Sequence, residues 1–170
     1  MDSNVKSNVL RKMTYGLWIL ATEHKGDREA STVTWLSQVS FTPPLIMVAL
    51  KVGTHLHQVV EQSGSFALHL VNKDQKDLAG AFTRPTDVKP GTIGGLKYVT
   101  GPLTGSPILE GFACWLEARV TDTVRRGDHT VFVAEVMLFD CTVQQRHCDG
   151  VRHAVVGGLA RGRFPLLRVA

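Results

Sequence analysis

Residues 30–57, ASTVTWLSQVSFTPPLIMVALKVGTHLH, decide the fold expected for this chain. The first part of the stretch is rich in hydroxyl and β-branched residues, which favour a strand. Thr42-Pro43-Pro44 then forms a corner, because proline lacks the backbone N–H that a central strand would donate. The apolar run from Leu45 to Leu50 predicts a second strand that is buried on both faces.

A short helix is expected directly after this strand. Thr54 is suited to cap its start and Gly64 to follow its end. The first N–H groups of a helix have no partner within it, and Lys51, His55 and His57 lie close by in the sequence. This combination predicts an anion or phosphate site, although an ordinary capped surface helix with solvated histidines explains the same residues.

Thr32 and Thr34 fall on the same face of the strand predicted for residues 29–37, since side chains alternate along a strand. They can therefore present neighbouring hydroxyls to a ligand. Threonine also favours strands by its shape alone, so a purely structural role is the alternative.

The flanking segments extend the same plan. Strands are predicted over 15–24, 66–71, 112–124, 130–141, 151–156 and 164–169, and short helices over 4–13 and 74–82. Lys25-Gly26-Asp27 predicts a hairpin turn, and the prolines and glycines from Thr83 to Gly105 predict an irregular surface excursion. Many strands with short turns and few helices favour an antiparallel barrel over a parallel sheet.

The two long strands over 112–124 and 130–141 are joined by a polar turn. The apolar face of the first strand is expected to pack on the core, and it comprises Cys114, Leu116, Ala118 and Val120. In the turn, Asp128 and His129 stand side by side, a pair that can donate and accept hydrogen bonds around a ring. A polar turn without a function is the alternative.

Length and composition indicate one domain over residues 1–170. The chain has 44% apolar and 20% charged residues, enough to build a core. It has neither a run long enough to span a bilayer nor a hydrophobic leader, so a soluble, cytoplasmic protein without membrane contact is expected. The net charge of +4 gathers in arginines late in the chain without a nucleic-acid motif, which favours anionic small ligands or a protein partner.

The three cysteines argue against both a disulfide framework and a metal site. Their number is odd and no CxxC spacing occurs. Cys114 is expected to be an inert core thiol. Cys141, His147 and Cys148 are too few to complete a zinc site, so no metal is predicted.

Six segments, in this order and over nearly the whole chain, resemble the flavin reductase-like family of FMN-binding split barrels. They are YGLWILAT (15–22), STVTWLSQVSFTPPLIMVAL (31–50), HQVVEQSGSFALHLV (57–71), DQKDLAGAF (74–82), GDHTVFVAEV (127–136) and GRFPLL (162–167). The resemblance implies a mainly β fold: a six-stranded antiparallel Greek-key split barrel with a few short helices. It also implies a homodimer with one FMN per protomer near the subunit interface.

The resemblance assigns site residues by position. The cofactor-binding residues that it implies are Thr32, Thr34, Trp35, Leu36, Ser37 and Gln38 along the flavin ring and ribityl chain, Lys51, Thr54 and His57 at the phosphate, and Phe82, Gly127 and Asp128 by the pocket and the ring edge. Two departures from the family pattern stand out. Leu56 replaces a small hydroxyl residue before the phosphate-site histidine, and Gly157-Gly158 lies where relatives often carry an aromatic residue.

The implied activity is hydride transfer from NAD(P)H to the flavin, with FMN as the cofactor and FAD as an alternative. Because the cofactor carries the hydride chemistry, no nucleophile or triad is needed. His129 is the candidate catalytic residue, since histidine exchanges protons near neutral pH. The electrons would pass to free flavin, oxygen or a redox or monooxygenase partner protein.

Two rival functions follow from other features. The first is a flavoredoxin-like electron carrier that docks an acidic protein through the late arginines. The second is a barrel that binds haem through His55, His57 or His69, because a fold does not fix a function.

Overall fold

The larger of two β-sheets organises the part of the chain that the computed structural model describes, residues 8–141. Its seven strands pair antiparallel in the order β2-β1-β5-β10-β11-β4-β3. Their bounds are β1 Trp18–His24, β2 Asp27–Val33, β3 Leu36–Ser40, β4 Leu45–Lys51, β5 Ser65–Leu70, β10 Cys114–Arg125 and β11 His129–Cys141. The prediction of an antiparallel, mainly β fold is confirmed.

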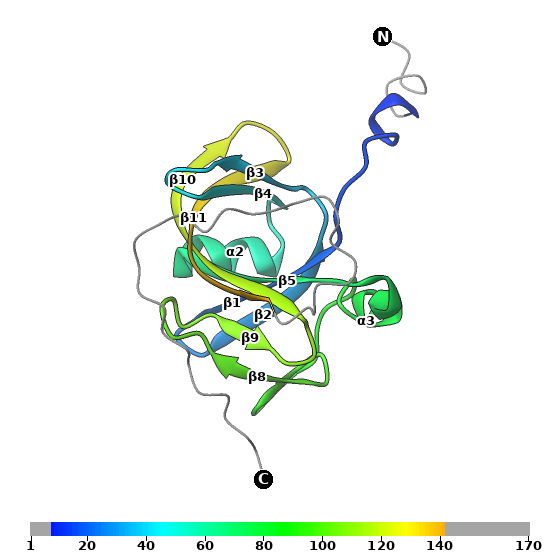
Figure 1. Cartoon of the computed structure of the whole chain (residues 1–170), viewed down its shortest axis with the longest axis vertical. Coiled ribbons are helices and arrows are strands. Elements are labelled where there is room, and N and C mark those ends of the chain that lie inside the picture. Colours follow the sequence, from blue (N-terminus) through cyan, green and yellow to red (C-terminus); the bar gives the residue numbers. More distant parts are fainter. Residues whose placement is uncertain (1–7, 142–170) are drawn as a thin grey trace.

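The two strands at the ends of this order, β2 and β3, are joined by only Thr34 and Trp35. The sheet must therefore curl until its ends meet, and Figure 1 shows the strands wrapping around helix α2 (His55–Ser63). When β2 and β3 are counted as one bent strand, the sheet has the six strands predicted. The order β5-β10-β11-β4 is that of a Greek key, because β4 lies beside β11 and away from β5, its successor.

The single strand predicted over 29–37 is thus broken at its centre. The N–H of Leu36 donates to the Thr34 carbonyl at 2.9 Å, a local turn that a continuous strand could not contain. The break lets one segment pair with β1 through β2 and with β4 through β3. The hairpin turn before β2 is as predicted, with Lys25 and Gly26 both at positive φ (51° and 90°).

The excursion predicted as irregular over Thr83 to Gly105 instead contains three strands of a second, four-stranded sheet, whose last strand follows it. The sheet comprises β6 Val88–Lys89, β7 Thr92–Ile93, β8 Leu96–Thr100 and β9 Pro107–Leu109 in sequence order. Ile93 and Leu109 are buried with Ile19 and Phe82, so this sheet closes its own small core against β1. Pairs of strands this short give little sequence signal, because their burial depends on distant residues.

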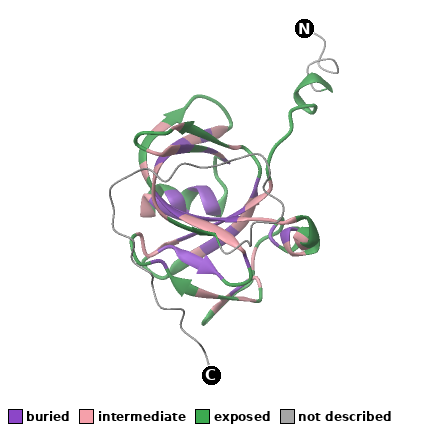
Figure 2. Cartoon of the chain, in the orientation of Figure 1, coloured by how far each residue is buried: buried purple, intermediate pink, exposed green. Residues whose placement is uncertain are grey.

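Helix α2 fills the inside of the curled sheet. Its buried residues Leu56 and Val60 pack with Phe66 and Phe132, and these residues form part of the purple centre of Figure 2. The predicted caps are confirmed: the Thr54 side chain accepts the His57 N–H, and Gly64 is left-handed with φ 64°. A 3-10 turn, η1 (Lys73–Gln75), and helix α3 (Lys76–Ala81) replace the single helix predicted over 74–82.

Strand β4 is buried on one face only, so the prediction of burial on both faces is wrong. Ile46, Val48 and Leu50 point into the core, whereas Met47 is 38% exposed. A curled sheet with one helix inside covers only its inner face, which explains the difference. The apolar residues on the outer face remain available for a partner.

On strand β10, burial is not limited to the face that was predicted to be buried. Glu117 lies on the face opposite the one expected to pack on the core, yet it is fully buried. Its Oε1 accepts the N–H (2.8 Å) and the hydroxyl (2.6 Å) of Thr104, because the loop over 101–106 covers this face. The loop lies so close that a Cβ on Gly101 would overlap the Glu117 carboxylate.

Cys114 is joined to Cys141 by a disulfide, so its prediction as an inert thiol is wrong. The two cysteines are direct partners across the β10–β11 hairpin, with Cα atoms 4.0 Å apart. Sequence spacing of 27 residues gave no sign of this pairing. Within residues 8–141, no group of three or more His, Cys, Asp or Glu side chains could hold a metal ion.

Several predictions concern residues outside the described range. They are the strands over 151–156 and 164–169, the GRFPLL segment, Gly157-Gly158, His147, Cys148 and the late arginines. Of the helix predicted over 4–13, the described part is helical at 8–10. Among the described residues, no helix combines the length and the apolar character needed to cross a bilayer.

His69 on β5 is fully buried and hydrogen-bonded at both ring nitrogens. Nε2 accepts the Leu109 N–H at 2.9 Å, so Nδ1 carries the proton and donates it to the Ile19 carbonyl at 3.1 Å. Burial lowers the pKa of His69 to about 4. The ring thus ties β5 to β1 and β9 in its neutral form.

This lowered pKa predicts a loss of stability in mild acid. Below the ordinary histidine pKa of about 6.5 the unfolded chain binds a proton that the folded chain excludes, which costs about 1.4 kcal/mol per pH unit until about pH 4. Urea unfolding should therefore show that His69 lowers the stability by about 2 kcal/mol between about pH 6.5 and pH 5. The measurement is the change in the free energy of unfolding with pH, in wild type and in His69→Gln. Equal slopes in the two proteins would contradict the lowered pKa of His69.

Candidate functional site

A cavity of about 650 Å³ opens where β2 and β3 separate. Four chain segments and one further side chain meet there: β2 with its bend, the end of β4, the first turn of α2, the segment after α3, and His129 at the start of β11. The residues that line the cavity are Leu17, Glu29, Ser31, Thr32, Val33, Thr34, Trp35, Ala49, Leu50, Lys51, Thr54, His55, Leu56, Phe82, Thr83, Arg84, Pro85 and His129. Both residues of the bend, Thr34 and Trp35, are among them.

Backbone hydrogen bonds fix the bend and the segment after α3. The Ala49 N–H donates to the Trp35 carbonyl, and the Thr32 N–H donates to the Phe82 carbonyl, both at 3.0 Å. The Thr32 hydroxyl donates to the Ala79 carbonyl at 2.7 Å. Thr32 therefore holds α3 against the sheet, and its hydroxyl oxygen can still accept a hydrogen bond from a ligand.

The first turn of α2 provides donors at one side of the cavity. The Thr54 hydroxyl donates to the Lys51 carbonyl at 2.8 Å and accepts the His57 N–H at 3.3 Å. Lys51 and Arg84 add two cationic side chains to the lining. Backbone donors at a helix start with two cations beside them suit a phosphate.

His55, the first residue of α2, is held between two carboxylates. Its Nδ1 lies 2.8 Å from Glu29 Oε2 and its Nε2 lies 2.9 Å from Asp27 Oδ2. These hydrogen bonds, that of Asp27 first, raise the pKa of His55. Both ring nitrogens face acceptors, so the geometry favours the imidazolium form.

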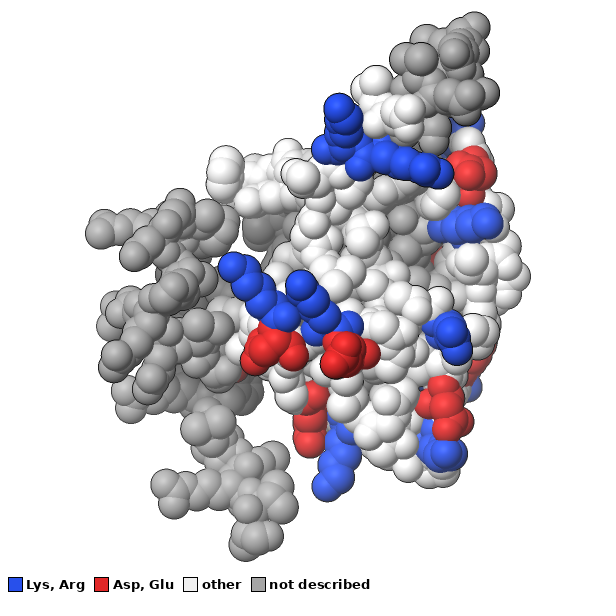
Figure 3. All heavy atoms as spheres, turned by 90° about the vertical axis from the view of Figure 1, so that its right-hand side faces the viewer, with Lys and Arg blue, Asp and Glu red and all other residues white. Residues whose placement is uncertain are grey.

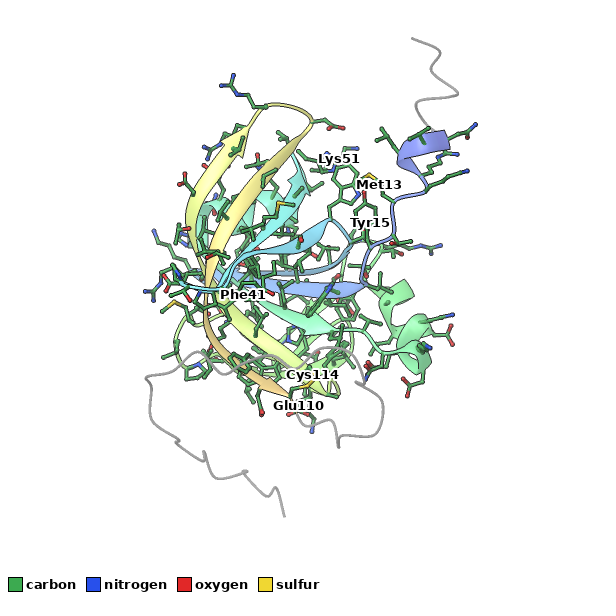
Figure 4. The ribbon with its side chains drawn as sticks, turned by 45° about the horizontal axis from the view of Figure 1, so that its top comes forward. Met13, Tyr15, Phe41, Lys51, Glu110 and Cys114 are labelled. Atoms are coloured by element: carbon green, nitrogen blue, oxygen red, sulfur yellow. A yellow bond between two sulfur atoms is a disulfide. The ribbon has the colours of Figure 1, made fainter. Side chains whose placement is uncertain are left out.

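The imidazole ring of His129 lines the cavity and contacts the indole ring of Trp35. Its ring centroid lies 4.5 Å from that of Trp35, and Tyr15 extends the aromatic group at 6.5 Å from Trp35. The Asp128 carboxylate lies 2.9 Å from His129 Nδ1, a hydrogen bond that lowers the pKa of Asp128. In Figure 4, Lys51 and Tyr15 lie at the same end of the molecule, away from Cys114.

Comparison with known proteins assigns the chain to a family. The family model for the flavin reductase like domain matches residues 10–157. The chain belongs to the flavin reductase like family. It is 29% identical over 138 residues to the NADH-dependent flavin reductase StyB of Pseudomonas fluorescens, covering 80% of this chain and 77% of that one.

Two further relatives illustrate the range of this family. The chain is 24% identical over 130 residues to the FMN reductase (NADH) RutF of Stutzerimonas stutzeri, covering 76% of this chain and 74% of that one. The solved structure of the styrene monooxygenase flavin reductase of Pseudomonas putida S12 has a TM-score of 0.67 and 29% identity, covering 79% and 85% of the two chains. Of two other curated relatives the chain spans less than half the length, 46% and 38%.

The structure brings together seven of the residues that the family resemblance implied. Those that line the cavity are Thr32, Thr34, Trp35, Lys51, Thr54, Phe82 and His129. The other six lie outside the lining: Leu36, Ser37 and Gln38 on β3, Gly127 and Asp128 in the hairpin turn, and the buried His57. Asp128 still contacts the site through His129.

His57 faces a different part of the protein than its predicted phosphate role requires. Its Nε2 lies 2.8 Å from the Thr130 hydroxyl, and it lines a second cavity of about 540 Å³ with Gly127, Arg125 and Glu61. The backbone N–H of His57 still donates to the hydroxyl of Thr54, which lines the main cavity. The helical periodicity that buries Leu56 and His57 together explains this placement.

Sequence reasoning missed several lining residues. Arg84 follows the family motif by two residues, so the irregular segment after Phe82 carried a usable signal. Glu29 carried none, because it reaches His55 only through the packing of β2 against α2. His55 entered the prediction as one of the histidines near the helix start and as a haem ligand, without its carboxylate partners.

The three histidines considered as haem ligands are all engaged within the protein. Both ring nitrogens of His55 face carboxylates, and both ring nitrogens of His69 are hydrogen-bonded inside the fold. His57 Nε2 is bonded to Thr130. An axial ligand needs a ring nitrogen directed at the iron, so these contacts disfavour haem.

Proposed function

We propose that this protein is an NAD(P)H-dependent flavin reductase that binds FMN in the 650 Å³ cavity. The observation that carries the proposal is that one cavity combines an anion-binding helix start with the aromatic pair Trp35 and His129. A flavin mononucleotide has the same two ends, a phosphate and a flat ring. The names of the relatives, NADH-dependent flavin reductase and FMN reductase, support the assignment.

The side chains present fit this ligand, and each has a physical role. Bound flavin supplies the hydride-accepting chemistry. Lys51, Arg84 and the first backbone N–H groups of α2 hold the phosphate. Trp35 and Phe82 exclude water beside the ring, and Asp128 holds His129 in one orientation so that it can donate a hydrogen bond or a proton at the ring edge. FAD shares the phosphate and the ring, and FMN is proposed because RutF is named an FMN reductase.

We propose that the protein is a homodimer whose subunits meet on the outer face of β3 and β4. Val39, Phe41 and Met47 are exposed there by 49%, 73% and 38%. Phe41, labelled in Figure 4, lies in the turn between these strands. Exposed apolar groups gathered on one hairpin favour association.

The reduced flavin is proposed to serve an oxygenase partner, as the name of the styrene monooxygenase flavin reductase suggests. On the face drawn in Figure 3, basic and acidic side chains are interspersed.

The absorption spectrum tests the proposal. We expect purified protein to retain FMN after desalting, and the flavin bands to bleach under anaerobic NADH or NADPH. Flavin that bleaches with dithionite but with neither nicotinamide would indicate an electron carrier instead of a reductase. A Soret band in the purified protein would favour haem binding. A protein that neither retains FMN nor reduces added FMN would contradict the proposal.

A further inference from the structure

The wall of the cavity beside the α2 start carries one carboxylate, and a second lies close to it outside the lining, an unexpected charge beside a phosphate site. Glu29 is buried and lines the cavity, and Asp27 precedes it on β2 by two residues. Glu29 Oε1 is occupied by the Ala30 N–H at 3.1 Å. Its other oxygen and the Asp27 carboxylate both turn to His55.

We propose that His55 is a positioning residue that makes this wall compatible with the flavin phosphate. Bridging Asp27 and Glu29, it neutralises part of their charge and turns both carboxylates away from the ligand. The inference rests on the proposed function and assigns to His55 the role of balancing the charge of Asp27 and Glu29 at that site.

The protonation state of His55 decides the net charge of the group formed by Asp27, Glu29 and His55. With His55 protonated, the three groups sum to −1, from two carboxylates and one imidazolium, and with His55 neutral they sum to −2. A phosphate at the helix start would lie close to this extra charge and be repelled. Riboflavin has the same ring without the phosphate, so it should not respond.

The other charged groups near His55 do not replace it. The first turn of α2 contains no acidic residue, and Glu23 on β1 is already paired with Arg28 at 3.0 Å. The remaining charged groups that line the cavity are Lys51, Arg84 and His129. Lys51 and Arg84 lie at the proposed phosphate end.

The test compares FMN with riboflavin in wild type and His55→Gln. Dissociation constants come from quenching of flavin fluorescence at about pH 6.5, where the raised pKa of His55 keeps most of this side chain protonated. We expect His55→Gln to weaken FMN binding about fivefold to tenfold, as one lost charge near the surface implies, with riboflavin changed less than about twofold. Lys97→Gln is the matched control, since it removes an exposed positive side chain on β8 outside the lining, and both ligands should bind it as they bind wild type.

The pH dependence of wild type provides a measurement that needs no variant. Between about pH 6.5 and pH 9 most of the phosphate carries its second charge, since its second pKa is about 6. His55 loses its proton as the pH rises through its raised pKa, so the preference for FMN over riboflavin should fall in wild type and stay flat in His55→Gln.

The outcomes separate this inference from the proposed function. Equal weakening of both ligands would assign His55 a merely structural role, and an unchanged FMN preference in variant and pH series would also overturn the inference. In either case, FMN binding and bleaching by NADH in wild type would leave the reductase assignment intact. Wild-type protein that binds neither ligand would contradict both.

Discussion

Replacement of His129 by alanine is expected to slow flavin reduction by NADH about 100-fold, the lower range for loss of a positioned proton donor. His129 is the one residue of the cavity lining that combines a tilted ring contact with Trp35 and a carboxylate partner, Asp128. The measurement is anaerobic stopped-flow at saturating NADH, with FMN affinity measured separately. The FMN dissociation constant should change far less than the rate, because the phosphate contacts remain.

Two variants sharpen this experiment. Arg126→Ala alters the same hairpin turn outside the main cavity and should keep the rate within about twofold. Asp128→Asn retains a hydrogen-bonding side chain beside His129 and should cause a smaller loss than His129→Ala. If the alanine variant reduces flavin at the wild-type rate and binds FMN equally well, His129 has no part in the reaction.

Removal of the buried Glu117 carboxylate is expected to destabilise the fold by about 3 kcal/mol, since three donors lose their acceptor. Glu117→Ala strips the hydrogen bonds from Thr104 N–H, the Thr104 hydroxyl and the Leu103 N–H. The loop over 101–106 would then lose its attachment to β10. Urea unfolding monitored by circular dichroism measures the change.

The matched control is Glu110→Ala, an exposed glutamate in the same part of the fold, expected within about 0.5 kcal/mol of wild type. Gly101→Ala should destabilise in the same direction as Glu117→Ala, because the added Cβ overlaps the carboxylate. If Glu117→Ala unfolds at the wild-type urea concentration, water replaces the carboxylate and the attachment is not needed.

The fold was predictable from sequence where local interactions decide it. The Lys25-Gly26 turn, the Thr54 and Gly64 caps and the apolar run of β4 each depend on residues within a few positions. The same reasoning went wrong where burial depends on distant segments. Alternation along β10 placed Glu117 on the face away from the predicted core, and the loop over 101–106 nevertheless buries it.

For the site, motif positions carried the prediction only part of the way. Seven of the implied residues line one cavity, but His57 turns inward to Thr130 because helical periodicity places it beside the core. The Glu29–His55 contact joins residues 26 positions apart, and no spacing rule predicts it. Such pairs follow from how β2 packs on α2.

The sequence by itself therefore determined most strands of the larger sheet, helix α2, the antiparallel class and the family of this protein, because turn residues, caps and ordered motifs act locally. The tertiary structure alone decided the break at Thr34-Trp35, the Cys114–Cys141 disulfide and the charge balance around His55. The physical reason is that these features arise from contacts between strands and helices far apart in the chain. Their geometry exists only once the sheet has curled around α2.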